Sequence, residues 1–333
     1  MTSSRPYWFR RPLLLTFYPH ETPTQLRFND HILDTTPAAF GPLRVSTDAL
    51  ADRDELHHRM VTDGYLDRAA VAAARQSSLE RLAAQDIFVA DAPRDEARLK
   101  PDIHMRSAQD MPLDNGPLLE LLYGGRMIEF YQFFLGGPVR HYNYTWFRAK
   151  TPTQNTASDP HCDIVYMGRG TPDLYTSWTP LGDIPQQMGG LLVLEKSHLN
   201  AELKRTYGRT DVDIYCENEG EAAAIVARAK AANRELTPQE RTAIRWTTRG
   251  AYAADPVAAR DALGGRWLTA DYQMGDLLVF TMFTLHCSHT NQTDRLRIST
   301  DTRYQLASEP IDPRWIGAEP PGNDIRAKRG TIC

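Results

Sequence analysis

The sequence predicts a mainly β protein, a sandwich or barrel with helices before it and a helical insertion within it. Short β-prone runs separated by turn residues follow residue 138, a pattern typical of such cores. They span residues 139–150, 164–167, 174–179, 191–194, 277–284 and 296–304. Residues 67–84 are instead rich in Ala, Leu and Arg, which are strong helix formers.

The N-terminal part is expected to be irregular at first and then helical. Residues 1–46 are rich in proline and aromatic residues and show no clear period, and the apolar run within them is too short for a signal peptide. We therefore assign them to an N-terminal extension. Helices are predicted at 48–60, 67–84 and 118–134, the last with an interruption at Gly124-Gly125, and a loop is predicted at 91–117.

The insertion is predicted at about residues 200–265, between two strands. Residues 217–232 form an alanine-rich helical pattern. Thr237, Pro238 and Glu240 then have the spacing of a helix start, with the threonine as N-cap and the glutamate reaching back to it. The prediction is one domain at residues 47–307, followed by a tail at 308–333 that is rich in proline, glycine and charge and is expected on the surface.

The composition argues against several classes of protein. The chain has 333 residues, with 38 Lys and Arg against 42 Asp and Glu, so its net charge is −4 and no basic field attracts nucleic acid. No apolar run approaches the roughly 20 residues of a membrane-spanning helix. The four cysteines include no CxxC pair, which argues against a zinc knuckle and favours a reducing cytoplasm.

Three residues indicate metal chemistry. His161 and Asp163 are two positions apart, a spacing that puts both side chains on one face of a strand and Cys162 on the other. His286 ends an apolar run much later in the chain. Two imidazoles and one carboxylate are the ligands of non-haem iron(II) oxygenases, which leave metal positions open. A lone His-x-Asp pair also occurs on protein surfaces, so the context decides its meaning.

Arg297 follows His286 after a polar turn. A hairpin would place the two residues opposite each other, and a jelly roll would place them on facing sheets that line one cavity. Ser288 shares the face of His286, and Ser299 shares that of Arg297. An arginine buried beside a metal needs an anion, and its planar fork suits the far carboxylate of a dicarboxylate cosubstrate. The alternative is a surface ion pair with a nearby aspartate.

These residues belong to a longer series of segments. The segments are HCD at 161–163, WTPLGDI from Trp178, GGLLVLEKSH ending at His198, Gly275-Asp276, HCSHTN at 286–291, and Arg297. Together they resemble the phytanoyl-CoA dioxygenase (PhyH) family of Fe(II)/2-oxoglutarate-dependent oxygenases. HHRMVTDGYL at 57–66 is similar to the N-terminal helix of that family, so the likeness covers roughly residues 55–305. The resemblance implies a double-stranded β-helix (jelly roll, cupin-like) with flanking N-terminal helices.

The resemblance also implies the roles of particular residues. The resemblance implies that the iron ligands are His161, Asp163 and His286. It implies that Arg297 and Ser288 bind the carboxylate of 2-oxoglutarate, with Ser299 as a competing partner of that carboxylate. Trp178 would line the cosubstrate site, and Trp146 would lie beside that site. Substrate contacts are expected at Tyr166, Arg169 and Asn143. His289 is an alternative ligand, and Cys162 and Cys287 are expected to be apolar packing residues rather than redox groups.

The implied reaction uses Fe(II), 2-oxoglutarate and O₂ to hydroxylate a small organic molecule, with release of succinate and CO₂. A biosynthetic tailoring step is one role for such a reaction. A carboxylate at Asp163 favours hydroxylation over halogenation, because related iron halogenases have Gly or Ala at this place. The same residues can serve desaturation, cyclisation or epimerisation. Two alternatives belong to other classes: a non-catalytic 2-oxoglutarate-binding protein and a zinc hydrolase on a cupin-like barrel. The zinc hydrolase would give Arg297 no role. The extension and the insertion are where substrate specificity is expected.

Overall fold

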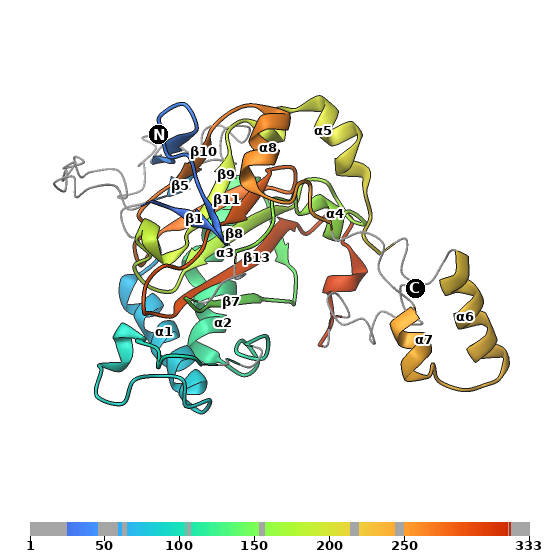
Figure 1. Cartoon of the computed structure of the whole chain (residues 1–333), viewed down its shortest axis with the longest axis horizontal. Coiled ribbons are helices and arrows are strands. Elements are labelled where there is room, and N and C mark those ends of the chain that lie inside the picture. Colours follow the sequence, from blue (N-terminus) through green and yellow to red (C-terminus); the bar gives the residue numbers. More distant parts are fainter. Residues whose placement is uncertain are drawn as a thin grey trace, which may run out of the picture.

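The computed structural model describes residues 25–45, 59–61, 65–103, 105, 108–152, 157–213, 220–243, 250–318 and 320. Their core is two β-sheets packed face to face (Figure 1). The larger sheet has the order β4 (Arg44–Val45), β5 (Arg59–Val61), β11 (Leu277–Thr281), β8 (Tyr175–Pro180), β13 (Arg297–Leu306) and β6 (Val139–His141), and β7 (Trp146–Lys150) also pairs with β13. The smaller sheet has the order β12 (His286–Ser288), β9 (Leu191–Leu194), β10 (Trp267–Thr269) and β3 (Phe40–Pro42), and β1 (Arg27–Phe28) pairs separately with β2 (His31–Ile32).

This arrangement is the jelly roll that the sequence predicts, with three local corrections. Residues 164–167 form a helical turn, α4 (Ile164–Met167), instead of a strand, because a short apolar run does not distinguish a buried strand from a buried helical turn. The run at 277–284 ends early as β11, and His286 begins β12 in the other sheet. The run at 139–150 divides into β6 and β7. Arg297 and His286 therefore lie on facing sheets, and the hairpin alternative is wrong.

Three helices cover the outer face of the larger sheet: α1 (Arg68–Ala83), α2 (Gly116–Tyr123) and α3 (Gly125–Leu135) (Figure 1). The side chain of Asp67 caps α1 by accepting from the N–H groups of Ala69 and Ala70. The predicted break at Gly124-Gly125 is confirmed as the junction of α2 and α3. Most of the helix predicted at 48–60 lies outside the described residues, but its last positions belong to strand β5, so the prediction is wrong there.

The ten residues of β13 alternate strictly between the two faces of the larger sheet. Ile298 and Tyr304 point outward and join the apolar cluster beneath the helices. The inward positions are all polar: Arg297, Ser299, Asp301, Arg303 and Gln305. They are buried or nearly so. Burying charged side chains costs desolvation free energy unless they meet partners. We therefore look for the functional site on this inner face of β13.

The insertion leaves and re-enters the smaller sheet between two neighbouring strands, β9 and β10. It contains α5 (Ala201–Arg205), α6 (Gly220–Ala231), α7 (Pro238–Ala243) and α8 (Pro256–Leu263), and α6 and α7 lie to one side of the sheets (Figure 1). The predicted helix start is confirmed: the N–H of Thr237 donates to Glu240 Oε2 at 2.9 Å, and the N–H of Glu240 donates to Thr237 Oγ1 at 3.2 Å. The domain limits stay predictions. No described helix combines the length and the apolar character that crossing a membrane requires.

The first part of the C-terminal tail is buried, which corrects the expectation of a surface segment. Arg314 has a side chain only 1% exposed, and it donates to Asp213 at 2.5 Å and to Asp312. Trp315 packs its ring 4.8 Å from that of Trp146. Proline and charge in this segment predict exposure only if the charges are solvated, and here they neutralise one another inside the protein.

Replacing Arg314 by methionine should lower the free energy of unfolding by about 3–5 kcal/mol, because it leaves two buried carboxylates without their cation. Chemical denaturation followed by fluorescence measures the change. Arg205→Met is the matched control, since the pair of Arg205 with Glu202 is exposed and contributes at most about 1 kcal/mol. Equal effects of the two substitutions would contradict the structural role of Arg314.

Candidate metal centre

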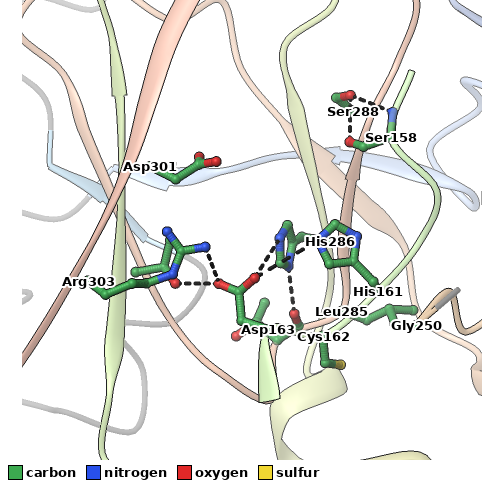
Figure 2. Close-up of polar contacts among 12 residues, drawn as sticks. Ser158, His161, Cys162, Asp163, Gly250, Leu285, His286, Ser288, Asp301 and Arg303 are labelled. Carbon is green, nitrogen blue, oxygen red and sulfur yellow. Dashed lines mark hydrogen bonds and ion pairs between the residues drawn. The ribbon is translucent and has the colours of Figure 1, made fainter. Parts of the chain in front are cut away.

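His161 and Asp163, two positions apart, converge on one point with His286 from much later in the chain (Figure 2). Oδ1 of Asp163 lies 3.9 Å from Nε2 of His161 and 3.7 Å from Nε2 of His286. One donor atom from each residue lies within 4.8 Å of the others. Asp163 and His286 are buried, and His161 is partly exposed. Two imidazole nitrogens and one carboxylate oxygen at this spacing can hold a single divalent metal ion.

The two histidines meet because their backbones form an antiparallel bridge. The N–H of His161 donates to the carbonyl of His286 at 3.0 Å, and the reverse bond is 2.9 Å long. Residues that exchange both bonds stand directly opposite each other, and the rings are 4.3 Å apart. Asp163 has helical backbone angles at the start of α4, so the expected continuous strand through His161 and Asp163 is wrong. Cys162 does point away, with its thiol donating to the carbonyl of Phe283.

Both histidines present Nε2 to the shared point. Nδ1 of His161 lies 2.7 Å from the carbonyl of Asp159, and Nδ1 of His286 lies 3.0 Å from the carbonyl of Thr284. A carbonyl only accepts, so Nδ1 carries the proton in each ring and the lone pair of Nε2 is left for a metal. Burial, and then the nearby His286, lower the pKa of His161 to about 3, so this ring is neutral at physiological pH.

The second carboxylate oxygen of Asp163, Oδ2, accepts hydrogen bonds from two residues of the larger sheet (Figure 2). Oδ2 accepts from Oγ1 of Thr176 at 2.6 Å and from Nη2 of Arg303 at 2.9 Å. Thr176 and Arg303 stand opposite each other on β8 and β13. Burial opposes ionisation, but Arg303 and the two histidines hold the pKa of Asp163 below its usual value. Oδ1 is thus the oxygen available to a metal.

Arg297 supplies a second feature, a buried cation without an anion. It is 1% exposed, and Nε and Nη1 have no hydrogen-bond partner among the described residues. Its guanidinium lies over the ring of Trp178 at 5.2 Å. Burial lowers the pKa of Arg297 to about 10, so the group stays charged at neutral pH. The alternative of a surface ion pair is therefore wrong, and the arginine can bind a carboxylate between the sheets.

Polar residues from both sheets surround Arg297. Lys150 is its neighbour across β7 and β13, and Nζ of Lys150 donates to Oγ of Ser288. That oxygen also accepts from the N–H of Ser158 at 3.0 Å (Figure 2). Burial, Arg297 and Arg148 lower the pKa of Lys150. Ser288 thus stands next to the basic group, as the predicted carboxylate site requires.

His289 belongs to this basic group and not to the three converging residues. Burial, followed by Arg297 and Lys150, lowers the pKa of His289 to about 3. Ser299 is fully buried on the inner face of β13, and its hydroxyl has no partner within the described part of the chain. Burial also raises the pKa of the thiols of Cys162 and Cys287, in keeping with a packing role.

The other expected site residues lie in different surroundings. Trp146 packs under the guanidinium of Arg303 at 4.4 Å. Tyr166 places its ring edge-on to His161 at 5.6 Å. Arg169 pairs with Asp211 at 2.7 Å, and Asn143 accepts from the N–H of Gly317 at 2.9 Å. Only Tyr166 of the three expected substrate contacts touches the metal-binding residues, and the roles of all three stay predictions.

Sequence reasoning missed Arg303, Thr176 and Lys150. One signal was present for Arg303: every second residue from 297 to 305 is polar within a run that reads as a buried strand. Thr176 and Lys150 carry no such signal. They become neighbours of the site only through the pairing of β8 and β7 with β13.

A jelly roll with two histidines and an aspartate at one point, and with a buried arginine whose Nε and Nη1 have no hydrogen-bond partner among the described residues, is typical of non-haem iron oxygenases that use 2-oxoglutarate. The family model of phytanoyl-CoA dioxygenase (PhyH) matches residues 132–299, half of the chain. The chain belongs to this family and is a 2-oxoglutarate-dependent non-haem iron oxygenase.

The chain is also similar to proteins of known structure. EctD from S. alaskensis, crystallised with 2-oxoglutarate and 5-hydroxyectoine, is 15% identical and has a TM-score of 0.50, and the match covers 89% of this chain and 88% of that one. The α-ketoglutarate-dependent carbocyclase SnoK from nogalamycin biosynthesis is 18% identical with a TM-score of 0.49, over 82% and 90% of the two chains. Comparison with curated proteins finds no significant match.

Proposed function

We propose that this oxygenase hydroxylates a small organic molecule, and that His161, Asp163 and His286 hold its iron. The observation that carries the proposal is the convergence of these three donors in a core that also holds Arg297, a buried arginine whose Nε and Nη1 have no partner among the described residues. The donor set suits Fe(II), because both Nε2 atoms and Oδ1 face one point while Nδ1 and Oδ2 are engaged elsewhere. Bound Fe(II), with 2-oxoglutarate and O₂, supplies the oxidising chemistry and yields succinate and CO₂.

Arg297 is proposed to bind the far carboxylate of 2-oxoglutarate, together with Lys150 and Ser288. Its free Nε and Nη1 supply donors, and Trp178 closes one side of the guanidinium. Lys150 adds a second basic side chain in the adjacent strand. Ser299 is the competing partner on the same strand face. A buried guanidinium is stabilised only when an anion covers it, so the cosubstrate completes this part of the core.

Asp163 distinguishes hydroxylation from halogenation. Its carboxylate stands where a halide-transferring site would need an empty position, and Arg303 and Thr176 hold it there. Tyr166, Arg169 and Asn143 remain the proposed substrate contacts, with Tyr166 the one that touches His161. The same residues can direct desaturation, cyclisation or epimerisation, so identification of the product is needed to distinguish these reactions from hydroxylation.

Two measurements test the proposal. Under anaerobic conditions, Fe(II) and 2-oxoglutarate together should produce a metal-to-ligand charge-transfer band, and admission of O₂ should then release succinate. A zinc hydrolase would show neither, and a binding protein would show the band without succinate. With a turned-over substrate and isotopically labelled O₂, the product should gain one labelled oxygen atom. A product lighter by two hydrogens would indicate desaturation instead of hydroxylation, and a product of unchanged mass would indicate epimerisation.

A further inference from the structure

We propose that Arg148, held in place by Asp301, binds a carboxylate of the primary substrate beside the metal centre. The inference rests on the proposed function and specifies its substrate class: a small carboxylic acid. Nothing in the iron or 2-oxoglutarate sites requires this arginine, so its placement needs a separate explanation.

The register of the sheet puts Arg148 on the inner face. Arg148 stands opposite Ser299, and Lys150, which shares its face, stands opposite Arg297. Phe147, the preceding residue, points outward into the apolar cluster beneath the helices. Arg148 therefore shares the interior with the residues proposed to bind iron and 2-oxoglutarate.

The side chain of Arg148 is more exposed to solvent than those of its neighbours in β7. Its side chain keeps 45% of its surface exposed, whereas Phe147 and Lys150 in the same strand keep 6% and 9%. Its partner Asp301 lies two residues before Arg303 on the same face of β13, and Arg303 donates to Asp163 at 2.9 Å, so Arg148 lies near the metal-binding residues. An exposed guanidinium this close to the centre is in position to meet a bound molecule.

Asp301 fixes the orientation of the guanidinium. Nε of Arg148 donates to Oδ2 of Asp301 at 2.8 Å. Asp301 is two residues before Arg303 on the same face of β13, and in Figure 2 its side chain lies above those of Arg303 and Asp163. Among the described residues, no hydrogen bond occupies Nη1 or Nη2 of Arg148. One edge of the guanidinium is thus anchored, and its terminal nitrogens are left as donors.

A planar pair of donors selects a carboxylate. Two parallel N–H groups match the two oxygens of that anion, and an arginine already anchored loses little rotational freedom on binding. The other basic residues of the interior have partners assigned: Arg303 pairs with Asp163, and Arg297 and Lys150 are proposed to take 2-oxoglutarate. Arg140, which stands opposite Gln305 on this face, donates to the carbonyl of Ala307. Among the described residues of the inner face, Arg148 keeps both terminal nitrogens as donors, and this arrangement favours an acid over the corresponding amide or ester.

The test compares wild type with Arg148→Gln, using a panel of small carboxylic acids, each paired with its primary amide. The readout is acceleration of 2-oxoglutarate decarboxylation, measured as succinate released above the rate without any added compound. At least one acid should stimulate wild type more than its amide. Arg148→Gln should raise the apparent KM for that acid by about ten- to a hundredfold and leave the KM for 2-oxoglutarate unchanged. Arg148→Lys should recover part of the affinity, since it keeps the charge without the fork.

Arg98→Gln is the matched control, because Arg98 forms the same kind of pair with Asp294 on the outer surface, also through Nε. The proposal is overturned if no acid outperforms its amide, if Arg148→Gln keeps the preference, or if Arg98→Gln loses it equally. Failure of the proposed function looks different: wild type would then lack the anaerobic charge-transfer band and release no succinate in O₂ at all.

Discussion

Replacing Asp163 by alanine is expected to abolish hydroxylation and to weaken Fe(II) binding more than about a hundredfold. This loss exceeds the roughly 10- to 100-fold loss that follows removal of a residue that only orients a metal ligand. The substitution removes the only carboxylate among the three converging donors. Two imidazoles then remain without a carboxylate to offset the metal charge, and the nearby positive charge of Arg303 repels the metal. Anaerobic titration with Fe(II) against a competing chelator measures the affinity, and product formation measures the activity.

Folding is controlled separately for this variant. Asp163→Ala leaves Arg303 buried without its anion, which by itself destabilises the protein. The double variant Asp163→Ala, Arg303→Met removes that charge, and it should fold more stably than the single variant while still lacking tight Fe(II) binding. Asp294→Ala, at an exposed ion pair, should bind iron as wild type does. Full activity in Asp163→Ala would refute its role as a ligand.

Arg297→Ala is expected to raise the apparent KM for 2-oxoglutarate about thirtyfold or more, with Fe(II) affinity near that of wild type. Truncating one partner of a buried, hydrogen-bonded charge pair costs about 2–5 kcal/mol, and each 1.4 kcal/mol is a factor of ten. Arg297 is fully buried, and two of its nitrogens have no partner in the described structure, so the cosubstrate is the anion that its removal would affect. Initial rates of succinate release give the KM.

The controls separate binding from folding. Arg297→Lys should restore part of the affinity, because a lysine keeps the charge but not the paired donors. Arg98→Ala, at an exposed pair, should leave the KM unchanged. Equal losses of Fe(II) and 2-oxoglutarate binding in Arg297→Ala would mean that the arginine maintains the fold instead of holding the cosubstrate.

Much of the site could be predicted from sequence because its chemistry belongs to particular side chains in short motifs. The motifs alone predict His161, Asp163, His286 and Arg297 as site residues, and the structure brings the first three together. The local backbone was harder to predict. The strand expected through Asp163 is the start of α4, because four apolar residues fit a buried helical turn as well as a buried strand.

The C-terminal tail shows the same limit. Its proline and charge content predicts an exposed segment, yet Arg314 and Trp315 are buried. Their partners Asp213 and Trp146 are far away in sequence. Composition indicates whether a charge is present but not whether another part of the chain neutralises it.

Residue identities and the order of short strands are enough to predict the donor types and a sandwich or barrel, and the resemblance of the motifs to a family of iron oxygenases implies the jelly roll. Only the three-dimensional packing shows that His161 and His286 stand opposite each other, that Arg303 pairs with one oxygen of Asp163, and that Nε of Arg148 donates to Asp301. These facts depend on pairing between strands more than a hundred residues apart. No local propensity encodes such pairing, because it is the packing of the whole core that selects the register.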